Sequence, residues 1–109
     1  MAYDETLAAR VRELLEGEPG LAEKKMFGGL GFLLNGNLAV GVSGADLMVR
    51  LPVDDGESVL AQPGVRPFER HGRAMNGWLL VEPPGHEQAR DLRRWVDRGR
   101  SFARTLPPK

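Results

Sequence analysis

Residues 24–42, KKMFGGLGFLLNGNLAVGV, alternate short apolar runs with glycine and asparagine. Asn35-Gly36 stands between two of these runs. A type I′ turn needs positive φ at both of its central residues, and asparagine followed by glycine is the pair that best tolerates it. The stretch therefore predicts a β-hairpin that turns at Asn35-Gly36.

Apolar runs of strand length continue along the chain beyond this hairpin. They lie at residues 25–27, 30–34, 38–42, 47–51, 65–69 and 78–82. The early runs are too close together for the crossovers of a dozen or more residues that parallel strands need. We therefore expect an antiparallel sheet of about five to six strands.

Three helices are expected: one before the strands, one between the fourth and fifth strands, and one at the end of the chain. Residues 7–15 repeat apolar side chains at helical spacing after Asp4, a favourable N-cap. A short helix is expected over residues 54–62, with Asp54 and Asp55 capping it. The predicted order, α-β(3-4)-α-β(2)-α, indicates a two-layer α+β fold with the helices on one face of the sheet. A chain of 109 residues has the size of one domain, residues 1–109.

The final helix, expected over residues 86–106 and followed by a frayed end, has an apolar side and a basic side. Core packing is the preferred interpretation of the aromatic residues on its apolar side. Arg90, Arg94 and Arg98 recur at four-residue spacing on the basic side. They are the candidate partner-binding residues, because arginine binds carboxylates and phosphates through two parallel hydrogen bonds. The preferred interpretation of the pattern itself, however, is a solvated face on which neighbouring aspartates pair with these arginines.

The net charge is zero, but it is unevenly distributed along the chain. Residues 1–85 carry eight Lys/Arg and twelve Asp/Glu, whereas residues 86–109 carry seven and three. Any attraction to nucleic acid is therefore expected from the C-terminal part. The chain has no cysteine, which is typical of the reducing cytoplasm. It has no apolar run of the roughly 18 residues that cross a bilayer, and the start MAYDET does not resemble a signal peptide.

No catalytic, cofactor-binding or metal-binding residues are assigned. The sequence GGLG at residues 28–31 fits neither a phosphate-binding loop nor a dinucleotide fingerprint, which both require a helix directly after the glycines. The first two glycines are interpreted as a bend or bulge, and Gly31 and Gly41 as positions that relieve crowding within the sheet. His71 and His86 have no second ligand at metal-binding spacing and are expected to face solvent. We therefore expect neither an enzyme nor a cofactor.

Several segments resemble the N-terminal domain of the TfoX/Sxy family, including DLMVRLP at residues 46–52. The most specific are KMFGG at residues 25–29, GVRPF at residues 64–68 and MNGW at residues 75–78. The resemblance covers nearly the whole chain and implies a two-layer α+β domain with an antiparallel sheet, of the kind seen in type III secretion chaperones. It supplies no catalytic residues. The signature residues expected to be structural are Lys25, Met26, Phe27, Gly28, Gly29, Met75, Gly77 and Trp78.

The resemblance also implies a regulatory role. Longer family members regulate bacterial natural competence, acting with the cyclic-AMP receptor protein at promoters, and carry a second, helical C-terminal domain. We expect this chain to be a stand-alone first domain and a non-enzymatic regulatory or protein-interaction module of the bacterial cytoplasm. The alternatives are a nucleic-acid-binding accessory protein that uses the arginine-rich final helix, and a small-molecule-binding domain.

We expect a protein partner, and a second copy in a homodimer is one candidate. We expect no contact with a membrane. In a sheet with one solvated face, apolar and polar residues alternate. Leu30, Phe32, Leu33 and Leu34 instead place apolar groups on both faces. Either a second copy or the chain's own helices would cover the second face.

Overall fold

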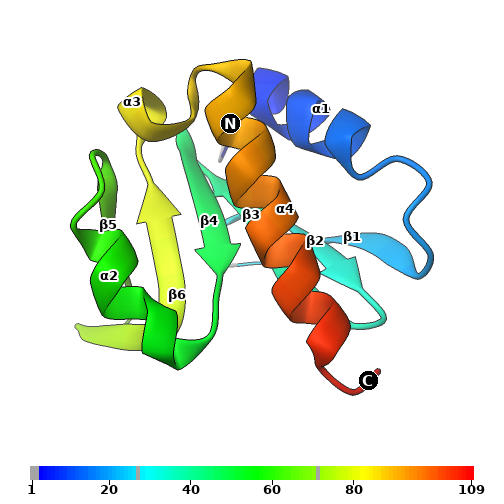
Figure 1. Cartoon of the computed structure of the whole chain (residues 1–109). Helices are drawn as coiled ribbons and strands as arrows, with labels where there is room; N and C mark the ends of the chain where they lie inside the picture. Colours follow the sequence, from blue (N-terminus) through cyan, green and yellow to red (C-terminus); the bar gives the residue numbers. More distant parts are fainter. Residues whose placement is uncertain (1–2, 27, 71) are drawn as a thin grey trace.

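A computed structural model describes residues 3–26, 28–70 and 72–109. Within these residues the structure has an α+β architecture whose helices and strands follow the predicted order, with one additional short helix (Figure 1). The elements are α1 (Glu5–Leu14), β1 (Leu21–Met26), β2 (Gly29–Leu34), β3 (Asn37–Ser43), β4 (Asp46–Arg50), the 3-10 turn η1 (Val53–Asp55), α2 (Gly56–Leu60), β5 (Val65–Arg70), β6 (Arg73–Val81), α3 (Pro83–His86) and α4 (Ala89–Thr105).

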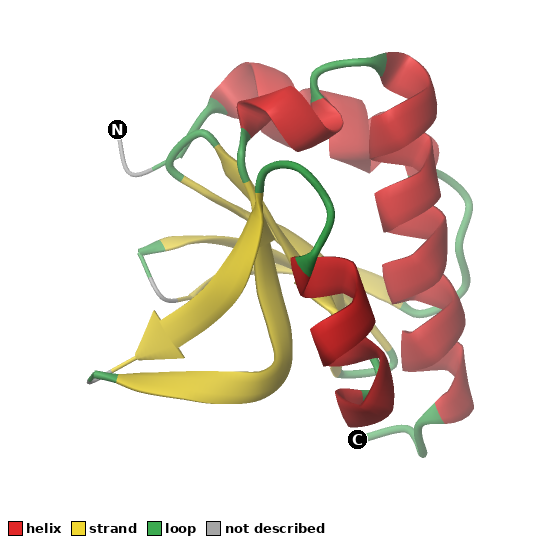
Figure 2. Cartoon of the chain, turned by 60° about the vertical axis from the view of Figure 1, so that its left-hand side comes forward, coloured by secondary structure: helices red, strands yellow, loops and turns green. Residues whose placement is uncertain are grey.

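The described strands form one antiparallel sheet, as predicted, in the order β1-β2-β3-β4-β6-β5. Figure 2 shows the helices gathered on one side of this twisted sheet. Lys24 and Lys25 are exposed on the edge strand β1, and Pro67 removes a hydrogen-bond donor from the other edge strand, β5. Lysine and proline on edge strands hinder pairing with a further strand.

The β2–β3 hairpin turns where the sequence predicts. Asn35 and Gly36 have φ values of 52° and 86°, and Leu34 pairs with Asn37 across the turn. A Cβ atom at Gly41 would lie 2.7 Å from Met48 Cε, and one at Gly31 would meet Met26 Sδ. The interpretation that glycine relieves crowding within the sheet is therefore confirmed.

The main core lies between the sheet and the helices α1 and α4. Asp4 caps α1 as predicted, since its carboxylate accepts hydrogen bonds from the backbone N–H groups of Thr6 and Leu7, at 2.9 and 3.2 Å. The largest fully buried side chains of this core include Trp95 of α4 and Phe32 of β2. Burial of these faces fixes both helices on the sheet.

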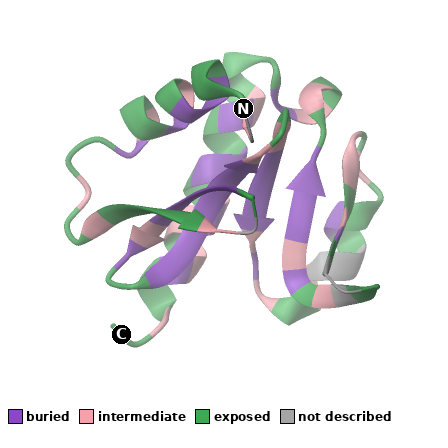
Figure 3. Ribbon diagram, turned by 180° about the vertical axis from the view of Figure 1, so that it is seen from behind, coloured by how far each residue is buried: buried purple, intermediate pink, exposed green. Residues whose placement is uncertain are grey.

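The opposite face of the sheet carries a second apolar cluster. Figure 3 shows the molecule from this side, with buried stretches of the strands in purple. The buried members of the cluster are Leu38, Met48, Phe68 and Leu80, and the partly buried side chains packed against them are Met26, Leu33, Met75 and Trp78. Met26 and Met75, two of the signature residues expected to be structural, therefore pack against apolar neighbours. Apolar groups do lie on both faces, and the homodimer stays a prediction.

The chain after β6 differs from the expected single long helix. Pro83 begins the short helix α3. Proline is tolerated at this position because the backbone N–H that it lacks would have no acceptor within the helix. Gln88 is extended, with ψ 141°, and separates α3 from α4. His86 is 5% exposed, and its Nε2 lies 2.9 Å from the carbonyl oxygen of Ala45. The prediction that His86 faces solvent is therefore wrong, and His71 lies outside the described residues.

Two further segments are more ordered than the sequence indicated. The backbone N–H of Lys109 donates to the Asn35 oxygen at 2.8 Å, and the side-chain amide of the buried Asn37 donates to the Pro107 oxygen at 2.9 Å. The C-terminal residues thus dock on the β2–β3 turn rather than fray. β6 begins at Arg73, earlier than predicted, because pairing with β5 continues up to the turn.

Candidate functional site

A groove of about 770 Å³ runs along α4 on the side that faces η1 and the end of β4. Figure 1 shows α4 and α2 on the same side of the sheet, with the end of β4 between them. The groove has an apolar floor and charged walls. Its lining residues are Leu51, Pro52, Asp55, Arg90, Arg93, Arg94, Asp97, Arg98, Ser101, Phe102 and Thr105.

The packing of α4 decides which of its residues reach the groove. Its buried residues are Leu92, Trp95, Val96, Gly99 and Ala103, all on the side that faces the sheet. Arg90, Arg94 and Arg98 consequently lie on the outer side, and the structure brings all three into the lining of the groove. Arg93, which the sequence did not single out, joins them there.

The floor of the groove is fixed by a signature residue of β6. The backbone N–H of Leu51 donates to the Gly77 oxygen at 2.7 Å. Gly77 has φ 82°, and a Cβ atom at this position would lie 2.6 Å from the Leu51 oxygen. Only glycine satisfies both the positive φ and this close approach. Gly77 therefore sets the position of Leu51 and Pro52 at the groove.

A second signature residue, Trp78, acts on the groove through Arg50. The guanidinium carbon of Arg50 lies 5.5 Å from the centroid of the Trp78 ring and 5.7 Å from that of Phe102. Both distances are within the range of cation–π attraction. Arg50 thus links β6 to α4 and steadies the Phe102 ring, which is half-buried at the groove floor.

The other signature residues do not line the groove. Lys25, Met26, Gly28 and Gly29 lie at the β1–β2 connection, and Phe27 lies outside the described residues. A Cβ atom at Gly29 would overlap the Val42 oxygen, and Gly28 has φ 74°. Glycine is therefore required at both positions of the predicted bend, by the close contact at Gly29 and by the positive φ at Gly28. Met75 belongs to the cluster on the second face of the sheet.

The arginines of the groove are weakly paired. Arg94 lies 3.7 Å from Asp91 and Arg98 lies 3.9 Å from Asp55, whereas Arg90 and Arg93 form no ion pair with any residue that the structure describes. Exposed ion pairs at such distances contribute about 0–1 kcal/mol. These guanidinium groups are thus available to an external anion at little cost.

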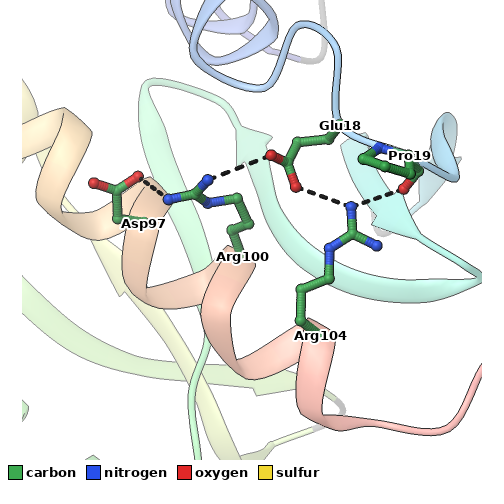
Figure 4. Close-up of polar contacts among 5 residues, drawn as sticks. All are labelled: Glu18, Pro19, Asp97, Arg100 and Arg104. Carbon is green, nitrogen blue, oxygen red and sulfur yellow. Dashed lines mark hydrogen bonds and ion pairs between the residues drawn. The ribbon is translucent and has the colours of Figure 1, made fainter.

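The neighbouring arginines on the same helix are, in contrast, firmly engaged. Glu18 lies 3.3 Å from Arg100 and 2.9 Å from Arg104, and Asp97 lies 2.8 Å from Arg100. Figure 4 shows Glu18 between the two arginines. Arg104 also donates to the Pro19 oxygen at 2.8 Å. These contacts fasten the α1–β1 connection to α4. The hydrogen bond from Arg104, with a second from Arg100, lowers the pKa of Glu18.

Stability should fall at acid pH because of this cluster. Since the pKa of Glu18 is lower in the folded chain, its stabilising effect is complete above the pKa that Glu18 has in the unfolded chain. It is lost as pH falls through the lower folded-state pKa. We expect Glu18→Gln to reduce the free energy of unfolding by about 0.5–1 kcal/mol at pH 7, and by less at pH 3. Urea unfolding at both pH values measures this, with Glu16→Gln as the exposed control; equal losses at the two pH values would contradict it.

Several groove residues were not identified from the sequence. Asp55 was expected to cap the short helix, but its side chain makes no capping hydrogen bond and turns to Arg98 instead. Leu51, Pro52 and Phe102 carry no local signal of a site. The one indirect signal is that Arg50-Leu51-Pro52 belongs to a segment that resembles the family.

Within the described parts of the chain, no group of three or more acidic or histidine side chains is placed to hold a metal ion. No helix in those parts is long and apolar enough to span a membrane.

A family model described as the TfoX N-terminal domain matches residues 13–103. The chain belongs to the TfoX N-terminal domain family. The matched residues run from α1 to near the end of α4, so they include the signature residues and all the arginines of the groove. Comparison with curated proteins and with solved structures found no significant match.

Proposed function

We propose that this TfoX N-terminal domain is a non-enzymatic interaction module of the bacterial cytoplasm, which captures a protein partner in the α4 groove. The observation that carries the proposal is a set of arginines beside an apolar floor, which are weakly paired or have no ion-pair partner among the described residues. Arginine and aromatic residues together are typical of the positions that dominate protein interfaces. The resemblance to competence regulators supports a regulatory role for this capture.

The absence of catalytic activity is part of the proposal. Among the residues whose burial the structure describes, the buried polar side chains are Asn37 and His86. The Asn37 amide and His86 Nε2 each lie within hydrogen-bonding distance of a main-chain oxygen, and His86 Nδ1 has no hydrogen-bond partner among the described residues. Neither residue lines the groove. The groove instead offers guanidinium groups and apolar surface, which bind and orient a partner.

A nucleic-acid partner is the second candidate, because the groove arginines could contact phosphates. In that case the logarithm of the binding constant should fall linearly with the logarithm of salt concentration, with a slope of about one for each phosphate contacted. The test below recovers protein and nucleic acid from the same sample and so separates the two candidates.

Reversing Arg90, Arg94 and Arg98 to glutamate should abolish capture of the partner while leaving the chain folded. Exposed substitutions usually cost under roughly 0.5 kcal/mol each. The measurement is affinity purification from the native host, with mass spectrometry of bound proteins and recovery of bound nucleic acid. A triple replacement by glutamine removes the charge without adding repulsion from nearby aspartates and serves as the second variant.

The matched control reverses Lys24, Lys25 and Arg73, which are exposed and lie away from the groove. It changes the net charge by the same amount and should retain the partner. Circular dichroism establishes that each variant is folded. Unchanged recovery with both groove variants would show that these arginines are only solvated surface.

A further inference from the structure

We infer that the occupant of the groove is an acidic, amphipathic helical segment of another protein, whose carboxylate replaces Asp55 on Arg98. This inference rests on the proposed function and specifies the partner's chemistry. Four properties of the groove carry it: its length, the spacing of its arginines, its floor and the contact between Asp55 and Arg98.

The length of the groove suits a helix rather than a small anion. Its lining follows α4 from Arg90 to Thr105, which at 1.5 Å per residue is about 22 Å. A partner helix of about 15 residues, or four turns, has the same length. Amphipathic helices that lie in grooves are a recurrent mode of peptide recognition.

The arginines of the groove are spaced to match carboxylates on such a helix. Arg90, Arg94 and Arg98 follow one another at four-residue intervals, so their Cα atoms rise by about 6 Å each. Acidic residues at four-residue intervals on a partner helix repeat at the same rise. Each guanidinium can bind a carboxylate through two parallel hydrogen bonds, which fixes orientation as well as adding affinity.

The floor and the walls together favour a peptide over a nucleic acid. Pro52 and the half-buried Phe102 offer apolar surface to a partner side chain, and the guanidinium carbon of Arg50 lies 5.7 Å from the centroid of the Phe102 ring. Asp55 and Asp97 also line the groove. A polymer with a phosphate at every unit would face these aspartates, whereas a peptide can place apolar or basic residues against them.

The contact between Asp55 and Arg98 resembles the contact that the partner would make. The two charged groups are 3.9 Å apart, and the side chains are 48% and 34% exposed, respectively. Asp55 comes from η1 on the opposite wall, and its side chain makes no capping hydrogen bond. A carboxylate with better geometry can therefore displace Asp55 without disturbing a helix end. Asp55 thus competes with the partner for Arg98.

The test uses the full chain and a synthetic peptide of about 16 residues, blocked at both ends, with leucines on one helical face and glutamates beside them. Binding is measured by calorimetry. The comparison ligands are the same peptide with glutamine for glutamate, a scrambled peptide of equal composition, and single- and double-stranded DNA oligonucleotides. We expect the acidic amphipathic peptide to bind at least about tenfold more tightly than each comparison ligand.

The deciding variant is Asp55→Asn, with Asp54→Asn as its control, because Asp54 is exposed and does not line the groove. Asp55→Asn should tighten peptide binding about two- to fivefold by freeing Arg98, and Asp54→Asn should leave it unchanged. The inference would be overturned if the two variants had equal effects, or if the glutamine peptide bound as tightly as the acidic one. Tighter binding of DNA than of the acidic peptide, or no saturable peptide binding, would also overturn it. Loss of the native partner on reversal of the arginines would still support the proposed function in those cases, so the two failures are distinguishable.

Discussion

Replacement of Trp95 by alanine should lower the free energy of unfolding by about 3–5 kcal/mol, as expected for truncation of a large buried aromatic residue. Trp95 is 1% exposed and lies in the main core between α4 and the sheet. Its indole N–H donates to the Gly85 oxygen at 3.1 Å. The substitution therefore opens a cavity and also leaves a carbonyl of α3 without its donor. Urea unfolding followed by far-ultraviolet circular dichroism measures the loss.

Trp95→Phe separates these two contributions, because phenylalanine keeps an aromatic ring but has no N–H donor. We expect it to cost about 1–2 kcal/mol, mainly from the lost hydrogen bond and the smaller ring. The guanidinium groups of Arg94 and Arg98 lie 5.5 and 5.6 Å from the Trp95 ring centroid, so the alanine variant should also loosen the groove wall. A loss below about 1 kcal/mol for Trp95→Ala would contradict the assignment of Trp95 to the core.

The elements that could be predicted from the sequence are those defined by neighbouring residues. Asn35-Gly36 specifies its turn by backbone conformation alone, and Asp4 caps α1 through the N–H groups of Thr6 and Leu7, which lie within three residues of it. The apolar arc of α4 is likewise visible as a period of 3.6 residues. Because that arc decides which side is buried, the outward position of Arg90, Arg94 and Arg98 could also be predicted.

The remaining features of the site depend on contacts between segments distant in the sequence. Phe102 lies on the apolar arc, but only the position of Arg50 and the end of β4 shows that its ring reaches a groove. Asp55 has the composition of a helix cap, and its alternative contact with Arg98 requires η1 to lie against α4. His86 is buried because α3 brings it to Ala45. A local pattern cannot indicate any of these contacts.

Gly99→Ala should also destabilise the fold, although helix propensity alone predicts the reverse. In an exposed helix interior, alanine is about 1 kcal/mol more favourable than glycine. A Cβ atom at Gly99, however, would overlap the carbonyl oxygen of Ala39 and lie 2.7 Å from Val40 Cγ1. Ala39 is backbone of the central strand β3 and is fully buried. It cannot move aside without disturbing the sheet.

The helix α4 must therefore move away from β3, which loosens the packing of the buried α4 residues on both sides of Gly99. We expect a net loss of about 2–3 kcal/mol in the free energy of unfolding, as in overpacked cores. Ser101→Ala, two residues further along on the exposed side of α4, serves as the control and should be neutral or slightly stabilising. Urea unfolding of both variants decides the matter. If Gly99→Ala changed the free energy of unfolding no more than Ser101→Ala, α4 could not lie as close to β3 as the structure places it. The position of the groove wall, which depends on α4, would then be wrong.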